Sequence, residues 1–203
     1  MKVALIGATG NIGSKVLAEL LRRGHTVTGI ARHPENLSPQ ENLTPQKGDV
    51  NDIDGLQRLI AGHDVAISSV HFVDTNAVRL LATVKVARVP RLLVVGGAGS
   101  LEVKPGVQLV DTPDFPDAYM EEALAGREFL NVLRAEQELD WSFLSPAAMF
   151  VPGERTGTFR LGTDQLLVDE AGKSGISPED FAVALVDELE TPRHSRQRFT
   201  IGY

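Results

Sequence analysis

The sequence has no cysteine, no long hydrophobic run and no excess of positive charge. The absence of cysteine from all 203 residues excludes disulfides, thiol nucleophiles and cysteine-based metal sites, and it suits a reducing compartment. The apolar runs fall well short of the ~20 residues that a membrane span requires. The N-terminus lacks the basic region and cleavage site of a signal peptide. We therefore expect a cytoplasmic protein with no membrane partner.

Charge and histidine spacing narrow the possible partners further. Twenty Lys and Arg against 27 Asp and Glu give a net charge of −7, which argues against general affinity for nucleic acid or anionic membranes. A local basic pocket for a small anion remains compatible with this charge. His25, His63 and His194 are scattered and show no metal-ligand spacing. We expect no nucleic-acid partner and no metal site.

Strand-like and helix-like segments alternate along most of the chain, which predicts a single α/β domain over residues 1–203. Strands are expected at 1–6, 25–30, just before 49, 64–68, 91–95, 141–144 and 198–201, and helices at 11–23, 52–62, 76–88, 118–138 and from 178 onward. Asp52 and Ser177 are the expected caps of two of these helices. Repeated strand–helix–strand units predict a doubly wound, Rossmann-like parallel sheet, whose ligands bind beyond the carboxyl ends of the strands.

The remaining segments are predicted to be irregular. We expect a loop with at most one helical turn over 32–45 and a long loop over 101–116, which contains three prolines. Residues 146–175 form a small, irregular substrate-side appendage, with turns and a short hairpin over 151–175. At its start, Pro146 leaves both a trans and a cis peptide bond open. The helix over 118–138 is expected to turn Leu124, Phe129, Leu130 and Leu133 inward.

The most informative motif joins the first predicted strand to the first helix. Gly7-Ala8-Thr9-Gly10-Asn11-Ile12-Gly13 follows the apolar run that ends at Ile6. Glycines at these positions permit a tight turn and a close approach of backbone to pyrophosphate. The backbone N–H groups and the positive end of the helix dipole then favour bound phosphate. The motif predicts a dinucleotide site.

The end of the second predicted strand bears on the choice of cofactor. Dinucleotide sites for NAD usually place an acidic residue about 20 residues beyond the glycines, where it binds the ribose hydroxyls. This chain has Ala31 followed by Arg32 at that place. Alanine removes the repulsion of a 2′-phosphate, and a guanidinium can bind one through two hydrogen bonds. The residues favour NADP(H) over NAD(H); the alternative is a solvated arginine in a polar loop.

These motifs resemble those of the atypical and extended short-chain dehydrogenase/reductases. The resemblance rests on the Gly7–Gly13 spacing, on Gly48-Asp49-Val50 and on the turn from Val95 to Leu101. Two later segments, 152–157 and 176–180, are similar to signatures of the NAD(P)H-flavin reductase group, which is related to NmrA-like proteins and biliverdin reductase B. The resemblance covers essentially the whole chain.

The resemblance implies a role for each matching residue. Ala8, Thr9, Gly10, Asn11 and Ile12 would hold the diphosphate and Arg32 the 2′-phosphate; Asp49 and Val50 would flank the adenine; Ser69, Val70 and His71 would follow the ribose; Gly97, Ala98 and Ser100 would approach the nicotinamide; and Pro146, Ala147 and Ala148 would form the floor beneath it.

The tyrosine–lysine pair of ordinary short-chain dehydrogenases is absent. In that pair a lysine four residues after the tyrosine lowers the tyrosine pKa for proton transfer to a carbonyl. Tyr119 is instead followed at this spacing by Ala123, and Tyr203 is the last residue. Hydride transfer to a flavin or quinone suits such a site, because the protein mainly positions two rings. Ser100 and His71 are the candidate proton donors, against the alternatives of a turn residue and a surface histidine.

Three functions remain open at this point. The first is an NADPH-dependent oxidoreductase that uses flavin as a substrate, or a similar flat small-molecule acceptor. The second is a redox-sensing regulator of NmrA type with a protein partner, and the third and weakest is an epimerase or isomerase. For Tyr119 the preferred interpretation is packing at the pocket rim. Glu154 and Arg155 are expected to form a structural ion pair, with substrate binding or a subunit contact as alternatives.

Overall fold

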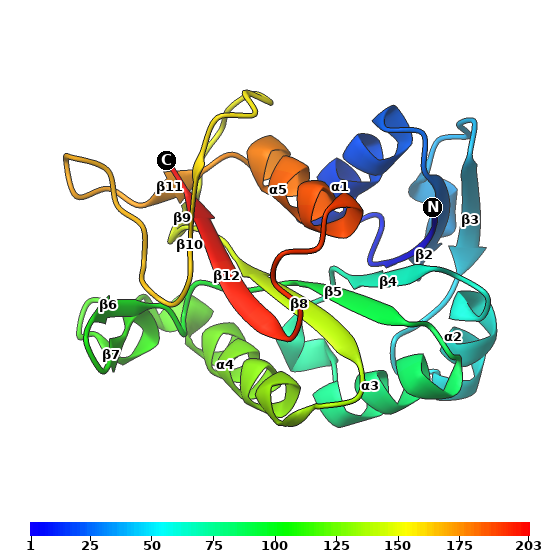
Figure 1. Ribbon diagram of the computed structural model, residues 1–203, viewed down its shortest axis with the longest axis horizontal. Helices are drawn as coiled ribbons and strands as arrows, with labels where there is room; N and C mark the ends of the chain where they lie inside the picture. The colour runs from blue at the N-terminus through cyan, green and yellow to red at the C-terminus, as the bar shows by residue number, and fades with distance from the viewer.

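One eight-stranded sheet forms the centre of the molecule. The computed structural model describes residues 1–203, and the strand order is β10-β12-β8-β5-β4-β1-β2-β3 (Figure 1). The strands are β1 (Lys2–Ile6), β2 (Thr26–Ala31), β3 (Leu43–Lys47), β4 (Val65–Ser68), β5 (Arg91–Val95), β8 (Asp140–Ser145), β10 (Arg160–Gly162) and β12 (Gln197–Gly202). All pairings are parallel except β10 with β12. The order reverses between β1 and β4, which confirms the predicted Rossmann-like sheet.

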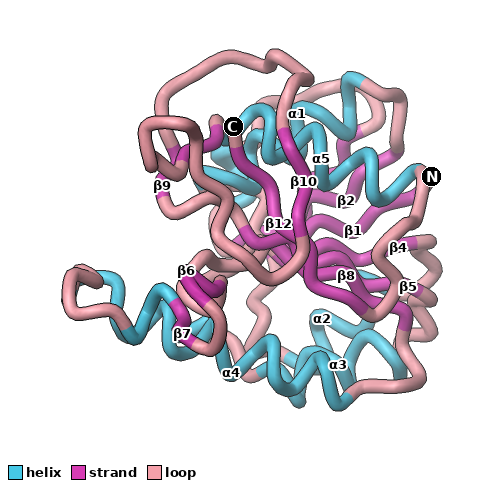
Figure 2. The backbone as a smooth tube through the Cα atoms, turned by 60° about the vertical axis from the view of Figure 1, so that its left-hand side comes forward, coloured by secondary structure: helices cyan, strands magenta, loops and turns pink.

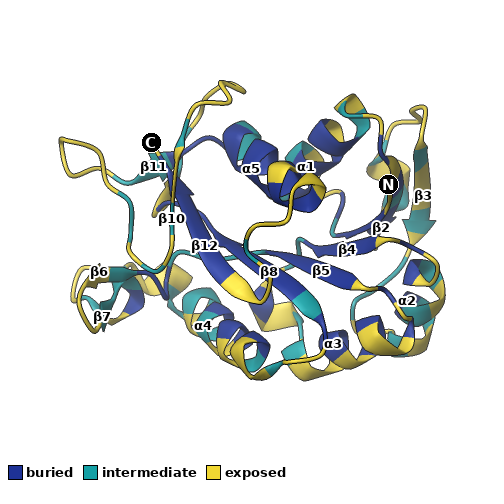
Figure 3. Cartoon of the chain, in the orientation of Figure 1, coloured by how far each residue is buried: buried dark blue, intermediate teal, exposed yellow.

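Five α-helices cover the two faces of this sheet. They are α1 (Asn11–Arg22), α2 (Ile53–Ile60), α3 (Ala77–Val86), α4 (Met120–Ala135) and α5 (Pro178–Glu190). Helices α1 and α5 pack on one face around Leu20 and Phe181, while α2, α3 and α4 cover the other around Leu56 and Trp141. The central strands are buried between these layers (Figure 3). Burial on both faces explains why their sequences read as continuous apolar runs.

Side-chain caps fix where three of the helices begin. Asp52 accepts a hydrogen bond from the Gly55 N–H, and Asn76 accepts one from the Arg79 N–H. Ser177 Oγ accepts from the Asp180 N–H at 3.0 Å, so the caps predicted at Asp52 and Ser177 are confirmed. Helix α1 differs, since it begins after Gly10 with no side-chain cap.

The loop predicted over 101–116 is wrong in part. It contains a small antiparallel hairpin of β6 (Glu102–Lys104) and β7 (Val107–Gln108). Pro105 and Gly106, with φ +76° at Gly106, make the turn between them, and a Pro-Gly pair suits a turn that needs positive φ at its third position. Figure 2 shows β6 and β7 projecting beside the start of α4.

The short hairpin predicted over 151–175 is also wrong. β9 (Met149–Phe150) instead pairs in parallel with β11 (Gly175–Ile176), and β10 joins the main sheet beside β12. Pairing of such short strands depends on distant partners rather than on local sequence. The peptide bond before Pro146 is trans, as are all others.

Two smaller predictions need correction. Leu124 is 39% exposed rather than inward, because it lies with Glu121 and Glu128 on the solvent-facing side of α4, whereas Phe129, Leu130 and Leu133 are buried. The predicted loop over 32–45 runs too far, since β3 begins at Leu43 and includes Pro45. The missing N–H of Pro45 is tolerated because β3 is an edge strand. The one helical turn allowed in this loop lies at Pro34–Asn36.

Candidate NAD(P)H-binding site

The glycines after β1 pack backbone against backbone. Gly7 has φ +87°, and a Cβ built on it would lie 2.1 Å from the carbonyl oxygen of Ser69. A Cβ on Gly13 would lie 2.0 Å from the carbonyl oxygen of Gly7. Neither position can accept a side chain without moving the neighbouring backbone. The loop is therefore closely packed, and it holds the start of α1 against the ends of β1 and β4.

The start of α1 presents unpaired backbone donors. The first helical hydrogen bond runs from the Ser14 N–H to the Gly10 carbonyl, so the N–H groups of Asn11, Ile12 and Gly13 have no intrahelical acceptor. Gly10, in the cap position, offers no side-chain acceptor. Thr9, Gly10 and Asn11 are exposed, whereas Ala8 is fully buried in the core. Asn11 is exposed, Ile12 half-buried and Gly13 buried. Unpaired N–H groups at the positive end of a helix can bind a diphosphate, which is the role predicted for this turn.

A basic pair lies at the carboxyl ends of β2 and β3. Arg32 follows the buried Ala31, is exposed and forms no ion pair or side-chain hydrogen bond. The register of β2 and β3 pairs Ala31 with Lys47, which is also exposed and free of an ion pair. The nearest acid along the chain, Glu35, is held by His33 at 3.0 Å. A backbone hydrogen bond and His33 lower the pKa of Glu35, so its charge is matched by a histidine rather than by Arg32.

The turn after β3 is organised around Asp49. The Gly48 N–H donates to the Ala31 carbonyl at 3.0 Å, and Asp49 Oδ1 accepts from the Asn51 N–H at 2.9 Å. A Cβ on Gly48 would lie 2.7 Å from side-chain atoms of Ile30 and Leu59. Val50 is half-buried against the core beneath. The turn therefore sets Asp49 and Val50 beside the end of β2, which is where the adenine side of the site is predicted.

The segment after β4 lies against the glycine loop at one end and α4 at the other. Ser69 donates its N–H to the Ile6 carbonyl at 2.8 Å, and Val70 Cγ1 would lie 3.1 Å from a Cβ on Gly7. His71 is 77% exposed, with Nδ1 3.4 Å from Glu122 Oε1. Glu122 also accepts the Phe72 N–H at 2.8 Å. The start of α4 therefore holds this segment in place.

The site residues predicted in the turn after β5 differ in how far they are buried. Gly97 and Ala98 are half-buried, whereas Ser100 is 4% exposed. Ser100 Oγ accepts a hydrogen bond from Arg198 at 3.3 Å, and the same guanidinium binds Asp164. Ser100 thus lies in a polar cluster that joins this turn to β12 and to the segment after β10; Ser100 and Arg198 are buried and Asp164 is half-exposed.

The three residues predicted as the nicotinamide floor follow β8. Pro146 and Ala147 are buried, and Ala148 is exposed and donates its N–H to Ser174 Oγ at 3.0 Å. Just before them, Ser145 Oγ is buried without a hydrogen-bond partner. Because β8, β5, β4, β1 and β2 are parallel neighbours, the loops after them meet at one edge of the sheet. The structure brings the predicted site residues to that edge.

Neither tyrosine has a lysine at the spacing of the catalytic pair. Tyr119 is 64% exposed just before α4, and Ala123 stands where the lysine of the pair would be. A Cβ on Gly99 would lie only 2.7 Å from the Ala123 Cβ, so the turn after β5 packs directly against that alanine. Tyr203 donates its hydroxyl to Asp180 at 2.9 Å, which makes it part of the α5 end instead.

Sequence reasoning missed Lys47, Asp164 and Arg198. Lys47 becomes relevant only through the register of β3, which the sequence does not fix. Arg198 and Ser100 are 98 residues apart in the chain. The one available signal was Arg198 itself, in the predicted terminal strand, because an arginine that becomes buried in a sheet needs a polar partner.

The molecule lacks both a membrane-spanning helix and a cluster of metal-binding side chains. No helix has both the length and the apolar character needed to cross a membrane. No group of three or more histidine, aspartate or glutamate side chains is arranged to hold a metal ion.

Comparison with known proteins places the chain in a family. A family model described as NAD(P)H-binding matches residues 7–192. A "putative epimerase" from Bacteroides thetaiotaomicron is 45% identical with a TM-score of 0.93, covering 100% of this chain and 96% of that one. A "putative exported protein" from Burkholderia pseudomallei is 47% identical, with full coverage of both chains and a TM-score of 0.89.

A third solved structure carries a reductase description. The "putative NADH-flavin reductase" from Streptococcus pneumoniae is 33% identical with a TM-score of 0.86, covering 100% of this chain and 99% of that one. Its likeness extends from the glycine loop to the C-terminal strand, in agreement with the resemblance to atypical short-chain dehydrogenase/reductases. Because the family model matches residues 7–192, this chain belongs to the NAD(P)H-binding family.

Proposed function

We propose that the protein is an NADPH-dependent oxidoreductase that transfers hydride to a flavin or a similar flat acceptor such as a quinone. The backbone N–H groups of Asn11, Ile12 and Gly13 bind the diphosphate. Arg32 and Lys47 bind the 2′-phosphate, which gives NADP(H) its advantage over NAD(H). When bound, the nicotinamide supplies the hydride. The chain supplies the binding, the orientation and the exclusion of water.

The observation that carries this proposal is the environment of Tyr119. A carbonyl reduction or an alcohol oxidation needs a positioned proton donor with a tuned pKa. Tyr119 is exposed, and Ala123 packs against Gly99 where a lysine would be required. A flavin ring that receives hydride at N5 can take its proton from water, so it needs no such pair. If the protein is an enzyme, the lack of that pair supports a flavin or quinone acceptor over a carbonyl or an alcohol.

The surface around the site edge also favours a flat, apolar acceptor. Exposed large hydrophobic side chains occur in the connections after three of the strands. They include Val73 after β4, Tyr119 between β5 and α4, and Met149 after β8. Such side chains contribute most to the free energy of binding when the ring of a ligand covers them and removes them from water. The segments predicted to surround the acceptor therefore carry suitable contact surface.

The two candidate proton donors differ in access. His71 is exposed, with its Nδ1 near Glu122 and the rest of the ring open to a ligand or water. Ser100 is buried, and Arg198 occupies one lone pair of its hydroxyl. We assign His71 the proton donation to the reduced acceptor, while Ser100 holds the turn that carries Gly97 and Ala98.

The direct test is an assay of NADPH oxidation with FMN, riboflavin and quinones as acceptors. We expect turnover with at least one flat acceptor and a lower KM for NADPH than for NADH. Tight NADPH binding without turnover of any acceptor would contradict the proposal.

The same site also suits a redox-sensing regulator, because absence of the tyrosine–lysine pair fits a binding protein equally well. The net charge of −7 then favours a protein partner over DNA. Partner capture that changes with the NADP⁺/NADPH ratio, together with no catalysis, would establish this second function. The assay above and this capture experiment separate the two.

An epimerase has less support. One similar structure bears the description "putative epimerase", but Ala123 removes the lysine that would tune Tyr119 for reversible oxidation of a sugar hydroxyl.

We also propose a cytoplasmic location, since a chain without cysteine suits a reducing compartment. The Burkholderia relative is described as exported, so cell fractionation is the deciding measurement. Recovery in the periplasmic or secreted fraction would overturn this location.

A further inference from the structure

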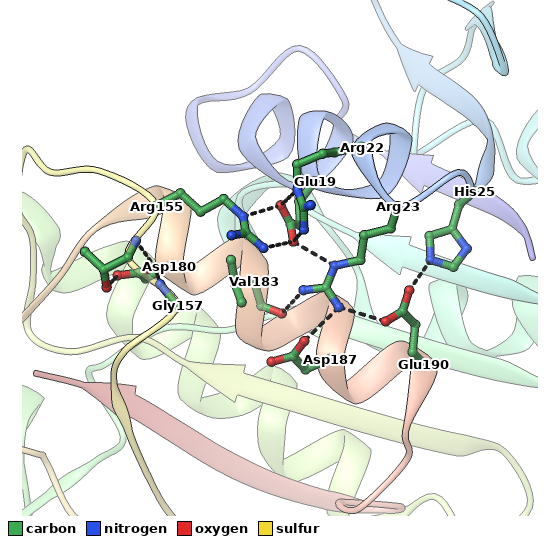
Figure 4. Close-up of polar contacts among 11 residues, drawn as sticks. Glu19, Arg22, Arg23, His25, Arg155, Gly157, Asp180, Val183, Asp187 and Glu190 are labelled. Atoms are coloured by element: carbon green, nitrogen blue, oxygen red, sulfur yellow. Dashed lines mark hydrogen bonds and ion pairs between the residues drawn. The ribbon is translucent and has the colours of Figure 1, made fainter.

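The Pro152–Gly157 motif is left unexplained by the proposed function. Residues 152–158 are all exposed, so apolar packing does not hold them. Figure 4 shows Arg155 reaching from this segment to Glu19 on α1. Arg155 Nε donates to Glu19 Oε2 at 2.9 Å, and Arg155 Nη2 donates to Glu19 Oε1 at 3.0 Å. A two-bond arginine fork of this kind fixes orientation as well as distance.

The surroundings of Glu19 keep its carboxylate ionised where Arg155 binds it. It is 5% exposed, and Arg22 and Arg23 also donate to its carboxylate at 2.7–2.9 Å. The Arg22 guanidinium, with further contributions from Arg155 and Arg23, holds the pKa of Glu19 well below its usual range despite burial. Arg22 alone already supplies a two-bond partner from the same helix. Arg155 is therefore an additional hydrogen-bond donor to Glu19, and it is the one that connects residues 152–158 to α1.

A second anchor lies directly beside the first. The fully buried Asp180, on α5, accepts the N–H groups of Thr156 and Gly157 at 2.8 Å each. Hydrogen bonds from Thr156, Gly157 and Tyr203 lower the pKa of Asp180, against the opposing effect of burial. Three consecutive residues are thus fastened to α1 and α5 by charge and hydrogen bonds alone.

We propose that Arg155 is a positioning residue for the acceptor pocket. Its bond to Glu19 fixes residues 146–159 on α1, the helix whose first turn is the diphosphate site. The segment begins with Pro146–Ala148, the predicted nicotinamide floor, so one helix sets the position of both the cofactor and the acceptor wall. The role of Arg155 in acceptor binding rests on the proposed function. The contacts of Arg155 with Glu19, and of Asp180 with Thr156 and Gly157, do not; we call these contacts the polar clasp.

The chain offers a matched control for this proposal. Arg22→Ala removes the same kind of two-bond fork from Glu19, and the two arginines are similarly exposed, 52% for Arg22 and 40% for Arg155. Arg22, however, lies on α1 itself and ties down no other segment. Arg155→Lys keeps the charge but loses the fork, and serves as a test of partial rescue.

The experiment measures three quantities on each variant. They are amide hydrogen exchange at residues 151–159, the affinity for NADPH, and the affinity of the NADP⁺-loaded protein for FMN by flavin fluorescence. For Arg155→Ala we expect about tenfold faster exchange and about tenfold weaker FMN binding, the scale of one charge-assisted hydrogen bond. NADPH affinity should change by less than about twofold. Arg155→Lys should fall between, and Arg22→Ala should match the wild type.

Two results would overturn the proposal. Unchanged exchange in Arg155→Ala shows that the other contacts, from Asp180 to Thr156 and Gly157 and from Ser177 to the Glu154 carbonyl, hold the segment without Arg155. Faster exchange with unchanged FMN affinity shows that the segment does not form the acceptor wall. If the wild type binds no FMN, the proposed acceptor class fails instead, and the exchange result by itself still decides whether Arg155 fastens the segment.

Discussion

The two sides of the site are held in place by different kinds of contact. On the nucleotide side, Gly7 and Gly13 let backbone touch backbone, with no room for a Cβ. On the side that we propose for the acceptor, residues 152–158 are exposed and are held by Arg155–Glu19 and by Asp180. Close-packed backbone admits one arrangement, whereas a polar clasp can open at a modest cost.

The largest effect is expected for Gly7→Ala. The substitution strains a backbone with φ +87° and drives a Cβ toward the Ser69 carbonyl. We expect a loss of about 4 kcal/mol in the free energy of unfolding, combining left-handed strain with overpacking, and no measurable NADPH binding. Thermal or urea unfolding checks the first and fluorescence titration the second.

Gly24→Ala is the matched control for that variant. Gly24 has a similar φ of +78° but nothing within 4 Å of a built Cβ. Its cost should be only the strain of about 1–2 kcal/mol, with NADPH binding kept. Equal losses in the two variants would show that close approach plays no part in the glycine loop.

The next largest effect concerns the charge of Glu19. Its folded-state pKa is lowered, so its contribution to stability is complete above the ordinary carboxylate pKa of 4.5 and disappears as the pH falls through the lower folded value. Glu19→Gln should cost about 3 kcal/mol at pH 7, because three guanidinium groups lose their shared charge. Below pH 4.5 the difference from wild type should shrink. Urea unfolding at several pH values measures this, and a difference independent of pH would argue against an ionised Glu19.

Arg32→Asp should act on the choice of cofactor rather than on stability. The aspartate repels a 2′-phosphate, and the guanidinium that binds it is gone. We expect NADPH affinity to fall about thirtyfold, corresponding to about 2 kcal/mol, with NADH affinity nearly unchanged. Parallel titrations with both cofactors test this, and equal losses for the two would refute the role of Arg32.

Lys47→Ser is the smallest expected change. An exposed ammonium contributes less than about 1 kcal/mol to an ionic contact, so NADPH affinity should fall about threefold and NADH affinity should stay the same. The loss should shrink at high salt because exposed charges are screened. No effect in low salt would remove Lys47 from the site.

The same division between the two sides explains how far the sequence could predict the molecule. The glycine loop and the caps at Asp52 and Ser177 are local signals, so the elements up to β5 were predicted with small boundary errors. The hairpin of β6 and β7, the pairing of β9 with β11 and the place of β10 depend on partners far along the chain. Lys47 depends on strand register, and the Arg155 fork joins residues 136 apart. Such contacts exist only once the chain has folded.

The central claim is hydride transfer from NADPH to a flat acceptor without a tyrosine–lysine pair. Anaerobic rapid mixing of the protein, NADPH and FMN tests it most directly, with the oxidation of NADPH and the reduction of FMN followed together. We predict matched amounts of NADPH oxidised and FMN reduced, at a rate that depends on the protein and is little changed in Tyr119→Phe. Binding of NADPH with no FMN reduction above the protein-free rate, or loss of the reaction in Tyr119→Phe, would contradict it.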